Sequence, residues 1–332
     1  MRRSKKLKKI PILLVLLIIT VTAFTVPRAL SITASAPFFS LNDGASVIVD
    51  TSEPPVLSAF PVDLLVSEPS AVKPSAHNNG YISVRMDVSG VSAGSLILIN
   101  HSHRYDIPDE TDFVSVSEMK TASYRAATDK ILVSGSVIGP LNEMMDAFRD
   151  ETGVSSVTVI SAFRDYEKQQ ETLDEYIALM GSAEASRWAA VPGYSEHQTG
   201  LAIDLGVFSG GALRTFLGTG VNAWFLQNSY KYGFVLRFPE NKTDITGTAH
   251  EPWHFRYVGI PHAYIMYQND LCLEEYIDML ADYSYDEPYR ITYDGEKYAI
   301  YSTRDSDVPI PFDCEFDISG NNTDGFIITL KF

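Results

Sequence analysis

The chain alternates two kinds of apolar pattern between residues 81 and 284, and this alternation limits its fold more than any other feature. Short runs rich in β-branched residues predict strands, whereas apolar residues spaced three and four apart predict amphipathic helices. The expected strands are residues 95–101, 154–162, 200–206 and 255–258, and the expected helices are residues 140–152, 165–180, 222–232 and 263–283. The pattern predicts a domain in which helices and strands share one core.

The last segment of the chain has a different texture. From residue 285 to residue 332, short runs rich in Tyr, Ile and Phe are separated by turn sequences at 294–295 and 319–322. We expect a small β appendage here. A segment of 48 residues buries little core by itself, so the appendage is expected to pack against the preceding domain or against a partner.

The N-terminal segment indicates a membrane anchor or a signal peptide. Residues 1–9 contain six Lys or Arg, and residues 10–26 are uncharged and almost wholly apolar. We favour an uncleaved transmembrane anchor, although the 17-residue run is short for one and residues 34–36 resemble a cleavage site ahead of Pro37. The basic segment then lies in the cytoplasm. Residues 27–80, rich in Ser and Pro, are expected to form an extracytoplasmic spacer.

Composition excludes one large class of partner. The chain has 26 Lys and Arg against 42 Asp and Glu, a formal net charge of −16, so we expect no nucleic-acid binding. Its two cysteines, Cys272 and Cys314, cannot form a disulfide framework. Outside the cytoplasm they are either bridged to each other or free, and the sequence leaves both possibilities open.

Two of the seven His residues lie in short motifs that suit metal binding. His197 comes seven residues before Asp204 in SEHQTGLAID, and His254 comes three residues after Glu251 in EPWHFRY. Two ligands from the first motif and one imidazole from the second would make a tetrahedral site with its fourth position open. Glu251 would be free to act as a general base. Each motif alone is weak evidence, since both spacings are common, but the combination is much stronger.

Three segments, SAFRDYEKQ (161–169), SEHQTGLAIDL (195–205) and EPWHFRYVG (251–259), resemble the zinc D-alanyl-D-alanine carboxypeptidases of the VanY type. That family belongs to a larger group with the lysostaphin-type peptidases and the zinc domain of hedgehog proteins. The resemblance covers about residues 90–280. It implies an α+β fold over residues 81–284, with a small antiparallel central sheet flanked by helices.

The resemblance also implies roles for individual residues. It implies that His197, Asp204 and His254 bind one Zn²⁺ per chain and that Glu251 is the catalytic base. Arg164 is expected to stabilise the developing oxyanion and to contact substrate.

Other residues of these motifs are expected to contact the substrate. Gln169 and Ser195 are expected to face it, and Trp253 is expected to form a wall of the site. His101 and His103 lie where they could approach the same cleft.

The implied reaction is removal of the terminal D-Ala from peptidoglycan stem peptides. Two readings within this class stay open, because a D,D-carboxypeptidase acting on pentapeptides and an L,D-carboxypeptidase acting on tetrapeptides share the zinc motif. A third reading, from another class, is a non-catalytic wall-binding module. Glu251 argues against it, since a binding module needs no base.

Overall fold

The computed structural model describes residues 76–77, 80–108 and 112–332 of the chain. The predicted basic segment, the predicted anchor and nearly all of the predicted spacer lie outside these residues. Among the described residues, no helix is both long enough and apolar enough to cross a membrane.

A mixed sheet forms the centre of the first unit. Its strands run in the order β4 (Arg125–Ala126), β6 (Val157–Ser161), β7 (Ala202–Ser209), β10 (His254–Tyr257) and β9 (Phe234–Leu236), and β8 (Ala212–Thr215) pairs with β7. Only the short β4–β6 pair is parallel. The predicted α+β fold with a largely antiparallel central sheet is confirmed.

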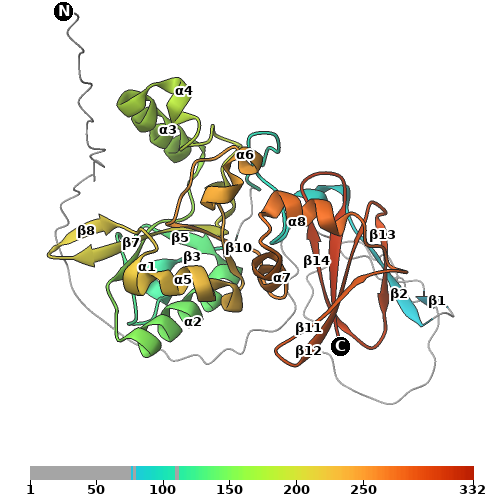
Figure 1. Ribbon diagram of the computed structural model, residues 1–332. Coiled ribbons are helices and arrows are strands. Elements are labelled where there is room, and N and C mark those ends of the chain that lie inside the picture. The colour runs from blue at the N-terminus through green and yellow to red at the C-terminus, as the bar shows by residue number, and fades with distance from the viewer. Residues whose placement is uncertain (1–75, 78–79, 109–111) are drawn as a thin grey trace, which may run out of the picture.

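Helices lie on both sides of this sheet (Figure 1). On one side are α1 (Val116–Met119), α2 (Gly135–Thr152) and α5 (Ala223–Asn228), and on the other are α3 (Tyr166–Met180), α4 (Ser182–Ala185) and α6 (Thr243–Thr246). A short ribbon of β3 (Phe113–Ser115) and β5 (Leu132–Ser134) leads into α2. Helix α2 buries Leu141, Met144, Met145 and Phe148, which recur at helical spacing and share one core with the apolar side chains of β6, β7 and β10.

The predicted strand at residues 95–101 is wrong, although its apolar residues are buried. Ile97 and Ile99 pack into the core of the central sheet, whereas Leu96 and Leu98 pack into a second core. The segment pairs with none of the described strands: the Leu98 N–H donates to the Asn321 carbonyl, and the carbonyls of Ser95 and Ile97 accept from an arginine side chain described below. The alternating side chains of this segment therefore pack into two cores on its opposite sides, and the alternation does not mark a strand of a sheet.

The predicted helix at residues 263–283 is two helices. Helix α7 (His262–Asn269) ends where Asp270 adopts φ 50°, and α8 (Leu273–Leu280) begins after Cys272. The Cys272 N–H is capped by the Glu275 carboxylate at 2.9 Å, which starts the second helix in a new direction. The predicted helix at residues 222–232 is likewise α5 followed by a 3₁₀ turn, Ser229–Tyr232, that ends at Gly233.

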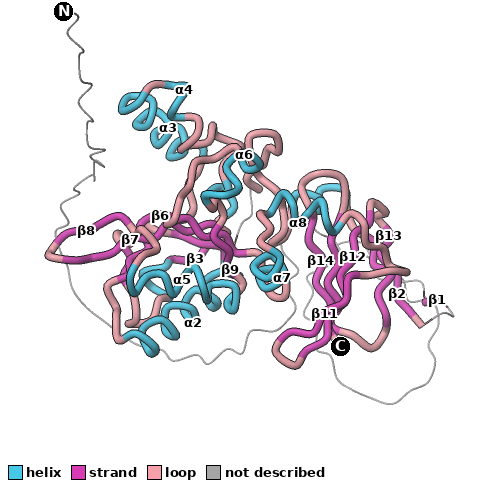
Figure 2. The backbone as a smooth tube through the Cα atoms, in the orientation of Figure 1, coloured by secondary structure: helices cyan, strands magenta, loops and turns pink. Residues whose placement is uncertain are grey.

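The C-terminal strands form a separate β unit, which Figure 2 shows beside the central sheet with α7 and α8 between them. One sheet has the order β11 (Tyr289–Tyr293), β12 (Glu296–Thr303), β15 (Phe326–Lys331) and β14 (Glu315–Gly320). The other is β1 (Ala76–His77), β2 (Tyr81–Arg85) and β13 (Asp307–Pro311). The β unit thus includes residues 76–77 and 81–85, which the sequence analysis places in the spacer and at the start of the catalytic domain.

The two units share a buried interface. Helices α7 and α8 contribute Ile265, Tyr276 and Leu280 to a core that also contains Ile300 and Ile327 of the β unit. The predicted packing of the β segment on the preceding domain is confirmed.

Candidate active site

Two neighbouring strands and one turn bring three potential metal ligands together. Strands β7 and β10 pair antiparallel with His254 opposite Asp204, so these two side chains emerge side by side. His197 lies on the 3₁₀ turn Glu196–Thr199, immediately before β7. One ligand atom from each of the three residues lies within 4.8 Å of the other two, and all three residues are buried. This is the set that the sequence motifs predicted.

The tautomer of His197 is set by the backbone. Its Nδ1–H donates to the Ala162 carbonyl at 2.6 Å, which leaves the Nε2 lone pair facing Asp204 Oδ2 at 3.3 Å. Burial and the nearby Arg164 cation lower the pKa of His197 to about 4. The imidazole is therefore neutral at physiological pH, as a metal ligand must be.

His254 presents its other ring nitrogen to the cluster. Its Nδ1 lies 3.2 Å from Asp204 Oδ1 and 3.5 Å from Glu251 Oε2. Burial disfavours the imidazolium, but the carboxylates of Asp204 and Glu196 outweigh it and raise the pKa of His254 to about 9. Without a metal, His254 is therefore protonated at neutral pH, and its positive charge lies beside the position that a metal cation would take.

The donor set fits a divalent cation. His197 Nε2 and Asp204 Oδ1 are buried and have no hydrogen-bond partner among the described residues. Two imidazoles and one carboxylate are a ligand set that Zn²⁺ accepts, with a fourth position left open.

Glu251 lies beside the cluster without belonging to it. Its N–H donates to the Phe238 carbonyl at 3.1 Å, which fixes the loop ahead of β10. Burial is the main cause that raises the pKa of Glu251 to about 8. A carboxyl group that titrates near neutral pH suits a general base.

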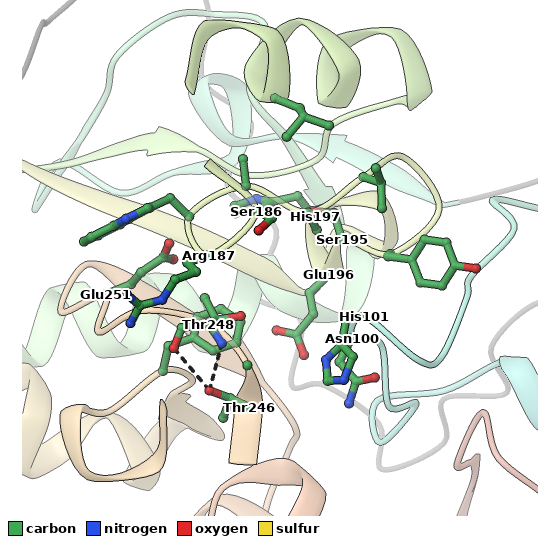
Figure 3. A pocket seen from close by; sticks show the side chains of 18 of the residues that line it. Asn100, His101, Ser186, Arg187, Ser195, Glu196, His197, Thr246, Thr248 and Glu251 are labelled. Atoms are coloured by element: carbon green, nitrogen blue, oxygen red, sulfur yellow. Dashed lines mark hydrogen bonds between the residues drawn. The ribbon is translucent and has the colours of Figure 1, made fainter. Parts of the chain in front are cut away.

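Of these groups, His197, His254 and Glu251 line one cavity of about 360 Å³. Arg164, Ser195, His197, Glu251 and His254 line it. Figure 3 shows Glu251 and Arg187 on one side of the cavity and Glu196, His101 and Asn100 on the other. The Arg164 N–H donates to the His197 carbonyl at 3.1 Å, so the arginine and the first ligand are positioned together. Arg164 Nε is buried and has no hydrogen-bond partner within the described part of the chain, which leaves the guanidinium able to bind a ligand.

Two residues predicted to contact substrate do not line the cavity. Gln169 is fully buried, and its Nε2 donates to the Ala190 carbonyl at 2.7 Å, because the first turn of α3 points it at the backbone of the cavity wall. Trp253 stacks at 6.3 Å on Trp188, and Trp188 is the one that lines the cavity. Both therefore support the wall from behind. His101 does line the cavity, whereas His103 bonds to Asn100.

A group of buried charges behind the ligands was not found from the sequence. Glu196 Oε1 accepts from Arg237 Nε at 2.7 Å and from Arg256 Nη1 at 2.8 Å, and Arg237 also pairs with Glu274 of α8. Arg256 Nη2 donates to the carbonyls of Ser95 and Ile97. The available signal was the placement of arginines within the apolar strand segments FVLRF and HFRY.

Comparisons with known proteins agree with this geometry. The family described as "VanY: D-alanyl-D-alanine carboxypeptidase" matches residues 130–260. A D-alanyl-D-alanine carboxypeptidase of Enterococcus faecium is 35% identical over 249 residues, which are 72% of this chain and 76% of that protein. Another, of Enterococcus faecalis, is 46% identical over 150 residues, which are 42% of this chain and 53% of that protein.

A solved structure extends the likeness to the fold. The vancomycin-resistance D,D-dipeptidase VanXYg, in complex with a D-Ala-D-Ala phosphinate analog, is 30% identical with a TM-score of 0.68. The match covers 75% of this chain and 98% of that chain. The shared fold and the length of the match to the Enterococcus faecium enzyme show that the chain belongs to the VanY-type D-alanyl-D-alanine carboxypeptidase family.

Proposed function

We propose that the protein is a zinc-dependent D-alanyl-D-alanine carboxypeptidase that removes the terminal D-Ala from peptidoglycan stem peptides. The observation that carries this proposal is that Glu251 and Arg164 line one cavity together with His197 and His254, which form a three-ligand cluster with Asp204. A wall-binding module without catalysis would have no use for a buried carboxyl group held beside a metal site.

Each group has a distinct task in peptide hydrolysis. A Zn²⁺ ion held by His197, Asp204 and His254 would supply Lewis acidity, which makes water a better nucleophile near neutral pH. Glu251 accepts a proton from the attacking water and delivers it to the leaving amine. Arg164 offers a fixed cation to the oxygen on which negative charge develops, or to the terminal carboxylate of the substrate.

The charges of the cavity favour a D,D- over an L,D-carboxypeptidase. An L,D-enzyme places the long amino side chain of Lys or diaminopimelate on the acyl side of the scissile bond, and an ammonium group there needs a partner. The only carboxylates that line the described cavity are Glu196 and Glu251. Glu196 is paired with two arginines, and Glu251 is needed as the base. A D-Ala methyl group needs no such partner.

Defined peptides test this proposal. The purified protein is incubated with a stem pentapeptide ending in D-Ala-D-Ala, with the matching tetrapeptide and with free D-Ala-D-Ala, each with and without a chelator. We expect release of D-Ala from the pentapeptide, loss of that activity with chelator, and recovery on adding zinc. Cleavage of the tetrapeptide alone would replace the D,D assignment with the L,D one. Absence of cleavage in every arm would contradict the proposed activity.

We also propose that the catalytic unit works outside the cytoplasmic membrane, attached through residues 10–26. The support is the basic and apolar sequence of residues 1–26 together with a substrate that belongs to the cell wall. Protease added to wall-stripped cells is expected to reach the chain beyond residue 81. Protection of that part would contradict the orientation, and a mature protein that begins near residue 37 would favour the cleaved signal.

A further inference from the structure

We infer that Glu196 is a positioning residue for the metal site, because its carboxylate holds the Nε2 side of His254 so that Nδ1 faces the other two ligands. The inference deepens the proposed function and rests on the same metal site. It starts from two buried atoms that lack a hydrogen-bond partner among the described residues, Glu196 Oε2 and His254 Nε2. These atoms face each other at 3.5 Å.

The local backbone explains how Glu196 reaches the far side of His254. Successive residues of a 3₁₀ helix point about 120° apart, so neighbours on the turn 196–199 face different directions. His197 faces Asp204, whereas Glu196 extends toward Asn100 and His101 (Figure 3). One turn therefore supplies a ligand and supports the ligand that comes from β10.

The carboxylate is itself held in place by two cations. Its Oε1 accepts from Arg237 and from Arg256, and the side chains of both arginines are fully buried. With Oε1 taken up in this way, Oε2 remains for His254. Two arginines and the carboxylates of Glu196 and Glu274 also balance each other in charge, so the buried group is neutral as a whole.

The consequence concerns which nitrogen of His254 is able to bind metal. A carboxylate only accepts, so it requires a proton on Nε2 and leaves the Nδ1 lone pair for the ion. A glutamine has a single acceptor oxygen, which the two arginines require at the Oε1 position, so its NH₂ group faces His254 and accepts nothing from Nε2–H. Carboxylates behind ligating histidines typically affect metal affinity about 10- to 100-fold.

The test uses two matched substitutions in the full chain, Glu196→Gln and Glu274→Gln. Both remove one carboxylate from Arg237, but only Glu196 faces His254. Zinc affinity is measured by competition with a chelator. We expect Glu196→Gln to weaken zinc binding about 10- to 100-fold and Glu274→Gln to stay within about threefold of the wild type. Equal weakening by both, or none by Glu196→Gln, would overturn the inference.

A spectroscopic readout separates positioning from general stability. In ¹⁵N-histidine-labelled wild-type protein, the Nε2–H of His254 is expected as a slowly exchanging, downfield proton, present both with and without zinc. Glu196→Gln is expected to lose this resonance, and Glu274→Gln is expected to keep it. Its absence from the metal-free wild type would overturn the inference, even if Glu196→Gln does not fold. Failure of the wild type to bind zinc would refute the proposed metal site but would leave this measurement standing.

Discussion

Replacing Glu251 by Gln is expected to separate catalysis from metal binding. The two side chains have nearly the same shape, and the N–H of residue 251 stays bonded to the Phe238 carbonyl, so the loop keeps its place. Glu251 lies 3.5 Å from His254 Nδ1 but is not one of the three clustered ligands. Loss of a general base typically costs about 10²–10⁴-fold in rate, or about 3–5 kcal/mol of transition-state stabilisation.

The assay measures D-Ala release from a pentapeptide and zinc content on the same samples. Glu251→Gln is expected to keep about one zinc per chain, whereas Asp204→Asn is expected to lose it. The pH profile gives an independent check. Burial raises the pKa of Glu251 to about 8 in the metal-free protein, and a bound cation favours the carboxylate. Wild-type activity is therefore expected to rise with pH on a limb whose midpoint lies below 8, and the variant is expected to lack that limb. More than a tenth of the wild-type rate in Glu251→Gln, or zinc loss as complete as in Asp204→Asn, would refute the reasoning.

Three further predictions concern binding and stability. Because the pKa of His254 is about 9 without metal, zinc must displace a proton to bind, so zinc affinity is expected to decrease as the pH is lowered below 9. Calorimetry in two buffers at pH 7 measures this proton release, and its absence would contradict the prediction. Burial lowers the pKa of His262 from 6.5 to about 3, so the unfolded chain takes up a proton that the native state refuses. As the pH is lowered from 6.5 to about 3, the free energy of unfolding should therefore decrease by up to about 1.4 kcal/mol per pH unit. Urea titrations of His262→Gln should show a shallower pH dependence than those of the wild type. Ile327→Ala in the shared core should cost about 2–5 kcal/mol of stability, seen as a lower melting temperature, with kcat unchanged at a temperature where the variant is folded.

Elements with local signals were predictable, and elements defined by distant partners were not. Helix α3 carries its own start signal, since the Asp165 carboxylate accepts from the Lys168 N–H at 2.7 Å, and it was predicted within one residue. Residues 95–101 look like a strand in isolation, yet none of the strands that the structure describes pairs with them, because Arg256 and Asn321 bond to their backbone groups. No local sequence signal distinguishes a strand that pairs in a sheet from an extended segment of this kind.

The sequence motifs predict which residues make the metal cluster, because His197 and Asp204 lie on a short path from a turn to a strand and His254 lies in the motif EPWHFRY. How each ligand is held depends on the tertiary structure. The Ala162 carbonyl orients His197, and the Glu196 carboxylate faces His254. It also placed Gln169 behind the cavity wall. Such contacts join segments far apart in the chain, and their geometry depends on how the sheet and helices pack, which no local pattern records.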